Sequence, residues 1–185
     1  MMNYKYKFLA LDLATEMIVR DPTSPELRAV RADVLSFLKD PESAIKEYKL
    51  AIDLKTNDSM VYINKARIED SLKHYFNSIA TSDSGLKLFP CNHNLYYLLV
   101  LAQEHLGLYN SAGDDYVAAL ACGMAGSMKD AINDRGQKYY ETGLLFFNRN
   151  QHDSAIHYFD KSYKLSRNPG ALYFRGYTYM NLQKD

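Results

Sequence analysis

The chain has 185 residues, which is enough for one compact domain or a short array of repeats. Its composition, 47% hydrophobic and 24% charged, is that of a folded protein and excludes intrinsic disorder. Lysine plus arginine and aspartate plus glutamate both number 22, so the formal net charge is zero. This balance argues against a nucleic-acid-binding protein, which needs clustered positive charge, and against a polybasic membrane anchor.

The N-terminal segment does not predict a signal peptide, because the apolar run Phe8–Leu11 ends at Asp12, too soon for the core of such a peptide. No apolar run reaches 18 residues, so we expect no membrane insertion. A disulfide between Cys91 and Cys122 is possible but not suggested by their spacing, and two thiols fit either a reducing compartment or no preference for one. The location is left open, and the cytoplasm is favoured only slightly, since a chain that begins and ends within a repeat can be a piece of a longer protein.

In chain order, the first half predicts only helices. Residues 3–20 form one helix with apolar residues at helical spacing, and Asp21-Pro22 ends it. Ser24 and Pro25 are typical of a helix start, and this second helix extends to about residue 39. Asp40-Pro41 starts a third helix that reaches about residue 54. Residues 57–59 form the next turn and cap.

The second half continues in the same way. Helices are expected over 59–72, 75–88, 93–106 and 109–122, with Pro90 and Gly107 in two of the turns. Ser127 with Asp130 resembles a helix cap, so we interpret 127–135 as added helix that leads into the next one, either without interruption or with a break at Gly136. The insertion either lengthens a helix or forms a projecting handle, and we favour the first. Helix 152–165 and a last helix after residues 168–170 follow. No stretch has the alternation of a strand, so the chain is predicted to be all-α.

One unit is repeated with a period of 34 residues. A small residue recurs at Ala32 and Ala66, with Val100 in the same column, and a second small column contains Ala44, Ser78 and Ala112. After Leu120 the register slips by 9 residues, since Tyr96 to Tyr139 is 43. The period then returns as 33 residues from Gly143 to Gly176. Fixed columns at this period indicate stacked helical hairpins.

Each unit resembles the tetratricopeptide repeat: a helix A with a large and then a small residue, a short turn, and a helix B with small–aromatic–small spacing. The resemblance covers nearly the whole chain and implies an α–α superhelix, a right-handed solenoid of antiparallel helical hairpins. We expect residues 1–185 to form a single solenoid. Its parts are a half repeat (3–22), three repeats (25–58, 59–92, 93–126), an insertion (127–135), a repeat (136–168) and a half repeat (169–185).

The resemblance also implies a concave groove lined by the A helices, which would bind a protein or peptide partner. The N-terminal half of this groove is polar, with Glu26, Ala29, Asp33, Phe37, Ile63, Asn64, Arg67 and Asp70. The C-terminal half is aromatic and aliphatic, and we place the partner site there. The candidate residues are Asn94, Tyr97, Leu101, Tyr140, Leu144, Phe147, Asn148, Tyr173 and Tyr177. The alternative is that these apolar residues pack on each other or under the insertion.

One specialised groove in this family grips chaperone tails with a clamp of Lys, Asn and Arg residues. From the first repeat the matching positions are Ala29, Asp33, Asn64, Asn94 and Leu98, of which only Asn64 fits. Starting one repeat later gives Ile63, Arg67, Leu98, Gln137 and Glu141, which also fail. The chain is therefore not expected to be such a clamp.

Nothing in the sequence predicts an enzyme. No phosphate loop, nucleophile motif or Cys-x-x-Cys is present. His152 and His157 are five residues apart, which places them about 140° apart around a helix, so no metal site is expected. We expect no cofactor, and we predict a non-enzymatic protein-interaction scaffold.

The last helix predicts an uncapped end. It presents Leu172, Phe174, Gly176 and Tyr179 toward a helix B that does not follow. Each large side chain left in water forgoes roughly 1.5–3 kcal/mol. We therefore expect either a longer chain or a homo-oligomer that pairs through this helix. The alternative function is accordingly a structural spacer or self-association segment whose groove is filled.

Overall fold

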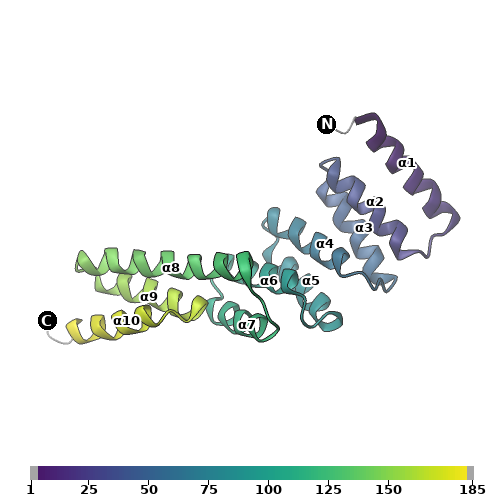
Figure 1. Ribbon diagram of the computed structural model, residues 1–185. Helices are drawn as coiled ribbons and strands as arrows, with labels where there is room; N and C mark the ends of the chain where they lie inside the picture. Colours follow the sequence, from purple (N-terminus) through teal and green to yellow (C-terminus); the bar gives the residue numbers. More distant parts are fainter. Residues whose placement is uncertain (1–3, 183–185) are drawn as a thin grey trace. The chain divides into compact units, whose positions relative to one another are not determined.

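The computed structural model describes residues 4–182, and within them the chain is entirely helical with no strand (Figure 1). The expected helix start at Asn3 and the end of the last half repeat, 183–185, lie outside the described residues. The helices are α1 (Tyr4–Arg20), α2 (Pro25–Phe37), α3 (Pro41–Asp53), α4 (Ser59–Ser71), α5 (Tyr75–Leu88), α6 (His93–His105), α7 (Tyr109–Ala121), α8 (Gly126–Asn148), α9 (His152–Ser166) and α10 (Pro169–Leu182).

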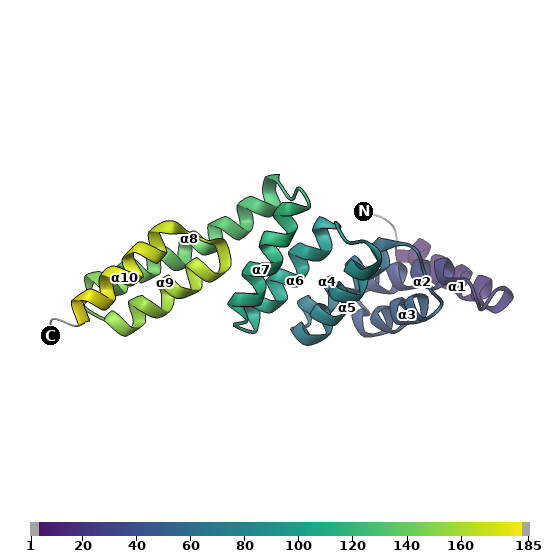
Figure 2. The same cartoon turned by 90° about the horizontal axis from the view of Figure 1, so that it is seen from below.

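Helices that follow one another pack as hairpins. The pairs α2–α3, α4–α5 and α8–α9 each share an extensive contact, and α10 packs on both α9 and α8 (Figure 2). This arrangement confirms the predicted α–α superhelical fold class. The chain divides into two compact units, residues 1–98 and 99–185, with the boundary inside α6. Each unit is described by itself below.

Local sequence signals fix the helix starts in the first unit. The Ser24 side chain accepts a hydrogen bond from the Leu27 N–H at 3.3 Å, with Pro25 in the first turn. Asp40 accepts one from the Ser43 N–H at 3.2 Å, and Asp58 accepts one from the Met60 N–H at 2.8 Å. These side chains pair N–H groups that have no partner within the helix, as predicted from their position before each apolar run.

The predicted cap and start of α8 were wrong, and the break considered at Gly136 does not occur. The helix begins at Gly126 without a side-chain cap, so Ser127 lies inside its first turn. It also continues without interruption through Gly136 to Asn148. Gly136 is there for close packing: a Cβ atom would lie 1.9 Å from Ser166 Oγ, and its carbonyl accepts a hydrogen bond from the Ser162 hydroxyl. The insertion therefore lengthens a helix, which was the favoured interpretation.

The core of the first unit consists of two clusters in which small residues face large ones. One joins Ala32, Ala44, Tyr48, Ala51 and Val61 across α2, α3 and α4. The other joins Tyr62, Ile63, Ala66, Leu95 and Leu98 across α4 and α6. Ile63 is only 1% exposed, so its predicted place in the groove was wrong. Of the other predicted groove positions on α4, Arg67 is exposed and Asn64 is half-buried.

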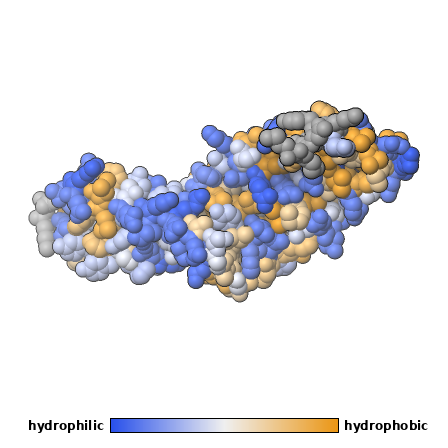
Figure 3. Space-filling model, turned by 45° about the horizontal axis from the view of Figure 1, so that its top comes forward, coloured by the Kyte–Doolittle hydropathy of each residue, from blue (hydrophilic) through white to orange (hydrophobic). Residues whose placement is uncertain are grey.

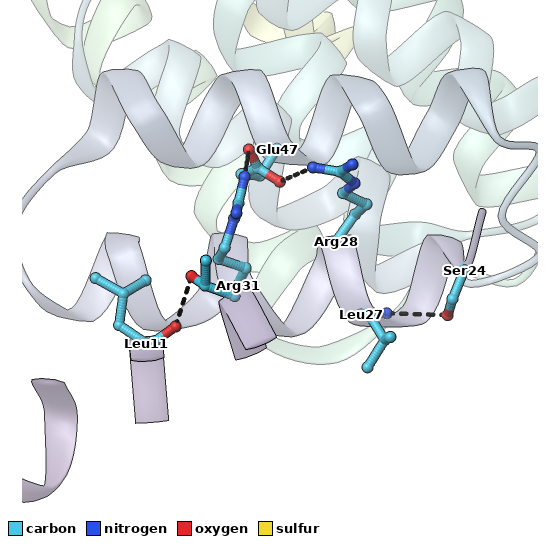
Figure 4. Close-up of polar contacts among 7 residues, drawn as sticks. Leu11, Ser24, Leu27, Arg28, Arg31 and Glu47 are labelled. Atoms are coloured by element: carbon cyan, nitrogen blue, oxygen red, sulfur yellow. Dashed lines mark hydrogen bonds and ion pairs between the residues drawn. The ribbon is translucent and has the colours of Figure 1, made fainter. Parts of the chain in front are cut away.

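A buried carboxylate ties α2 to α3. Glu47 on α3 forms ion pairs with Arg28, at 3.3 Å, and with Arg31, both on α2 (Figure 4). The Glu47 side chain is almost fully buried while both arginines keep partial access to water. Two guanidinium partners offset the cost of removing the Glu47 carboxylate from water. These two ion pairs therefore help to fix the position of α3 against α2.

In the second unit, Ala155, Phe159 and Ala171 form a buried cluster between α9 and α10. Half-buried rings of α8 and α10 pack around it. Gly143 on α8 admits the Phe159 ring, because a Cβ atom at this position would lie 2.6 Å from two ring carbons. The repeat position that carries a small residue is therefore the point at which helix A leaves room for an aromatic side chain of helix B.

Two further features concern the cysteines and the apolar character of the helices. Neither Cys91 nor Cys122 is a free thiol, so of the two possibilities left open by the sequence the pair of thiols is excluded, and cysteine usage lends no support to a reducing compartment. Within residues 4–182, no helix combines the length and the apolar character needed to cross a membrane.

Gly143 and Gly176 occupy the same repeat column and provide a matched test of this packing. We expect Gly143→Ala to lower the free energy of unfolding by roughly 1–3 kcal/mol, because the new methyl group overlaps the Phe159 ring. Gly176→Ala should raise it by roughly 0.5–1 kcal/mol, because nothing lies within 4 Å of the added Cβ and alanine is the better helix former. Urea denaturation measures both. Equal effects of the two substitutions would contradict this description of the core.

Candidate partner-binding surfaces

The first unit contains a hollow of about 540 Å³ on the faces of α2 and α4. Its wall combines charged, amide and apolar side chains, with Tyr48 of α3 at the back. The lining residues are Asp33, Ser36, Phe37, Leu38, Lys39, Tyr48, Asn64, Arg67 and Ile68. This hollow thus brings together four of the residues predicted to line the polar half of the groove, namely Asp33, Phe37, Asn64 and Arg67.

A hydrogen-bond network organises the polar wall of this hollow. The Tyr48 hydroxyl donates to Asp33 Oδ1, and Asn64 Nδ2 donates to the same oxygen at 3.2 Å. Arg67 donates in turn to Asn64 Oδ1 at 3.3 Å. Asp33 and Asn64 are therefore held in fixed orientations, whereas the Phe37 ring is 52% exposed beside them. A polypeptide could use both the polar edge and the ring.

The same network perturbs Tyr48. Burial raises the pKa of its phenol well above the usual range, and the hydrogen bond to the Asp33 carboxylate raises this pKa further. The phenol is therefore fixed as a hydrogen-bond donor and does not supply a base.

In the second unit, five aromatic side chains of α8 and α10 form one continuous group, which we call the aromatic row: Tyr140, Phe147, Tyr173, Phe174 and Tyr177. The Phe147 ring centroid lies 6.0 Å from that of Phe174 and 5.7 Å from that of Tyr177. Tyr140 contacts Phe174 at 6.0 Å, and the rings of Tyr173 and Tyr177 are nearly parallel at 6.4 Å.

Exposure divides the aromatic row into a base and an edge. Tyr140 and Phe147 are half-buried and pack, together with Leu144, against the Phe159 cluster. Tyr173 and Tyr177 are 67% and 40% exposed. Part of the predicted apolar face is thus core packing, as the alternative interpretation held, while its α10 edge lies in water. The row can present flat, apolar rings and two phenol hydroxyl groups to a partner.

The other candidate residues are more scattered. On the part of α6 in the first unit, Asn94 is exposed and Tyr97 half-buried. In the second unit, Leu101 is half-buried and Asn148, at the end of α8, is exposed. Of the nine candidates, the contacts bring together Tyr140, Leu144, Phe147, Tyr173 and Tyr177.

Sequence reasoning missed two residues. Tyr48 was not among the candidates, although a buried phenol needs a polar partner and Asp33 is available on the neighbouring helix. Phe174 was predicted to face an absent helix, which was wrong, since it packs against Tyr140, Phe147 and Phe159. Its position on α10, three residues after buried Ala171, is the signal that would have placed it inward.

The opposite face of α10 has no neighbour among the described residues of its unit. Leu172, Tyr179 and Met180 are exposed there, and nothing lies within 4 Å of a Cβ atom added at Gly176. The sequence had predicted this for Leu172, Gly176 and Tyr179. We call Leu172, Gly176, Tyr179 and Met180 the outer face of α10. Helix α1 of the first unit also exposes apolar residues, namely Leu9, Leu13 and Met17. Figure 3 shows hydrophobic surface gathered at the α1 end of the chain.

Comparison with known proteins agrees with this geometry. The sequence profile of a tetratricopeptide repeat family matches residues 25–58 and 139–169. A search of curated proteins found no significant match. The solved structure of MamA from Desulfovibrio magneticus RS-1, residues 41 to the end, is 18% identical, with a TM-score of 0.57 over 88% of this chain and 87% of that one.

Two other solved structures are similar. YrrB, described as a tetratricopeptide protein with an unusual peptide-binding site, is 10% identical, with a TM-score of 0.59 over 94% of this chain and 85% of that one. A chain of the Naa15/Naa10 complex bound to HypK is 16% identical, with a TM-score of 0.58 over 97% of this chain and 27% of that one. Within residues 4–182, ten helices with a small–large column at fixed period define a helical repeat protein. Together with the profile matches, they show that the chain contains tetratricopeptide repeats, at residues 25–58 and 139–169.

The raised pKa of Tyr48 predicts how stability depends on alkaline pH. The phenol stays protonated in the folded chain while the unfolded chain ionises near the ordinary pKa of 10.0. Its contribution to stability is therefore fully present below pH 10.0 and is lost as the pH rises from there toward the folded pKa. We expect the free energy of unfolding to fall more steeply above pH 10.0 for the wild type than for Tyr48→Phe in urea titrations. Parallel pH profiles would show that Tyr48 is not held in this way.

Proposed function

We propose that this protein is a non-enzymatic scaffold that binds a partner polypeptide through the A-helix faces of its repeats, with the aromatic row as the main anchor. The observation on which the proposal depends is the exposed edge of that row. Tyr173 and Tyr177 lie in water although they adjoin the buried cluster through Phe147 and Phe174. Rings that are held in place by buried neighbours on one side and exposed to water on the other are well suited to contact apolar side chains of a partner.

The geometry of the edge favours an extended or helical peptide with apolar anchors. The parallel rings of Tyr173 and Tyr177 are one helical turn apart and offer two equivalent surfaces along α10. Because tyrosine has few rotatable bonds and these rings already contact each other, little side-chain entropy is lost on binding. Asn148, exposed at the end of α8, can donate and accept hydrogen bonds with the peptide backbone.

The hollow of the first unit is proposed as a second contact region. Its Asp33–Asn64–Arg67 wall is fixed by hydrogen bonds and suits polar groups of a peptide, while Phe37 suits an apolar one. The wider family supports a protein partner, since tetratricopeptide repeats are generally scaffolds. Among the similar structures, YrrB is described by its peptide-binding site and the Naa15/Naa10 structure contains bound HypK. We retain the predicted repeat boundaries and the single solenoid as part of this proposal.

The direct test removes the edge without disturbing the core. We expect Tyr173→Ala/Tyr177→Ala to lose a partner that the wild type retains from lysate of the source cells, and to weaken its affinity at least about tenfold once the partner is purified. Tyr179→Ala is the matched control, because it removes an equally exposed tyrosine from the other side of the same helix. All three proteins must first show the same helical circular dichroism and melting temperature. If the double variant and the control bind equally well, the aromatic row is not the site.

A second function is favoured by the outer face of α10, and it is self-association. Leu172, Tyr179 and Met180 form an apolar strip beside Gly176, where another helix can approach the backbone closely. Leaving each large side chain in water forgoes roughly 1.5–3 kcal/mol, which a second copy of the chain could recover. In this role the protein is a spacer or assembly segment, and the aromatic row is filled by the assembly.

Sedimentation velocity separates the two functions. Self-association predicts a dimer whose population grows with protein concentration, and Tyr179→Asp should abolish it, because a charge would be buried at the contact. Tyr173→Asp, on the other edge of α10, is the control and should leave the dimer intact. A wild-type chain that stays monomeric up to high micromolar concentration would exclude pairing through this face.

A further inference from the structure

A third feature of the second unit lies on its B helices and is independent of the proposed partner surfaces. A hollow of about 410 Å³ is bounded by the turn before α7 and by the outer side of α9. Its wall includes Lys161 and Lys164 from α9 and the polar side chains of Asn110 and Ser111 from the first turn of α7. None of the candidate groove residues lines it.

Lys161 is held in this wall by three tyrosine rings. Its Nζ atom lies 5.1 Å from the ring centroid of Tyr109, 5.7 Å from that of Tyr139 and 5.1 Å from that of Tyr158. Each distance is within the range of a cation–π interaction, so the rings fix the ammonium group while it keeps its charge. The Lys161 side chain is half-buried, and the ammonium group is therefore positioned before any ligand arrives.

The three tyrosine rings are themselves held in place by neighbouring side chains. The Tyr139 hydroxyl donates to Glu104 Oε1 at 2.8 Å, and Arg135 pairs with the other oxygen of the same carboxylate at 3.3 Å. Tyr109 meets Tyr139 edge-on at 5.8 Å. Tyr158 stacks on Phe146 at 5.3 Å, with an interplanar angle of 11°. The Lys161 ammonium thus has a defined position on the surface of the unit.

This ammonium group lacks a counter-ion. Within residues 4–182, no ion pair joins Lys161 to a carboxylate. The only carboxylate in the wall of the hollow is that of Asp160, and it pairs with both Lys164 and Arg175 at 2.5 Å. Burial alone would raise the pKa of Asp160, but the hydrogen bonds from Lys164 and Arg175 outweigh it and lower this pKa. Asp160 therefore stays ionised and engaged, and the hollow keeps an excess of positive charge.

From this geometry we propose that the hollow bounded by Lys161, Lys164, Asn110 and Ser111 binds a phosphate group. The fixed ammonium group of Lys161, the ammonium group of Lys164, which also pairs with Asp160, and two neutral hydrogen-bonding side chains match the charge and the several acceptor oxygens of phosphate. A carboxylate, with one charge and two oxygens, uses fewer of these groups. The phosphate belongs either to a free small molecule or to a phosphorylated side chain, which share this chemistry.

The test titrates inorganic phosphate, N-acetyl-phosphoserine amide and acetate into the ¹⁵N-labelled chain, followed by NMR. We expect saturable shifts of the Asn110 and Ser111 amides with both phosphate probes and weaker effects with acetate. Stronger binding of the phosphoserine probe assigns the site to a phosphorylated polypeptide, and equal binding of the two assigns it to the phosphate group itself. Acetate binding as tight as phosphate binding, or no saturable shift at these amides, would overturn the proposal.

Variants of Lys161 show whether its ammonium group binds the phosphate. Lys161→Met keeps a long apolar side chain and should weaken phosphate binding at least about tenfold, whereas Lys161→Arg keeps the cation and should stay within a few fold of wild type. Lys138→Met is the control, since this exposed lysine of α8 lines a different hollow. Thermal melting checks that each variant folds. Equal loss in the Met and Arg variants, or equal binding by Met and wild type, would contradict the assignment.

Discussion

The structure depends on the close approach of two helices where one offers a small residue and the other a large ring. In the second unit this contact is Gly143 against Phe159, with Ala155 and Ala171 completing the cluster. In the first unit Ala32 and Ala44 serve the same purpose around Tyr48. Because a single Cβ atom at Gly143 would overlap the ring, this column sets how closely the helices of a hairpin can pack. Every surface feature is placed by that packing.

The same packing explains why some aromatic residues are buried and others are not. Phe159 is enclosed because helices contact it on more than one side. Tyr173 and Tyr177 lie at the edge of α10 and stay 67% and 40% exposed, although Phe147 of α8 contacts Tyr177. The tyrosines around Lys161 lie at the contact of α7, α8 and α9, half-buried and braced by polar groups. Aromatic residues are thus found in the core, at an exposed edge and around a lysine, according to their position in the repeat.

The sequence predicted the fold well because repeat packing has a fixed period. The columns at Ala32, Ala66 and Gly143 identified buried contacts, and the side chains of Ser24, Asp40 and Asp58 marked helix starts with a local hydrogen bond. The role of Gly136 could not be decided from the sequence, since glycine indicates either a break or a close contact and only the neighbouring helix decides which. Here Ser166 of α9 occupies the space that a side chain would need.

The candidate surfaces were predicted less well for a related reason. Helical register gives the face of a residue but not what covers that face, so Ile63 was placed in the groove although α6 buries it. The cage around Lys161 joins side chains from α7, α8 and α9, and no local pattern reveals that Tyr109 and Tyr139 lie beside this lysine. The central claim is that α8 and α10 form the partner surface. Hydrogen exchange by mass spectrometry, with and without the bound partner, tests it most directly. Slower exchange in α10 and the second half of α8 is predicted, whereas slower exchange confined to α7 or α9 would contradict the account.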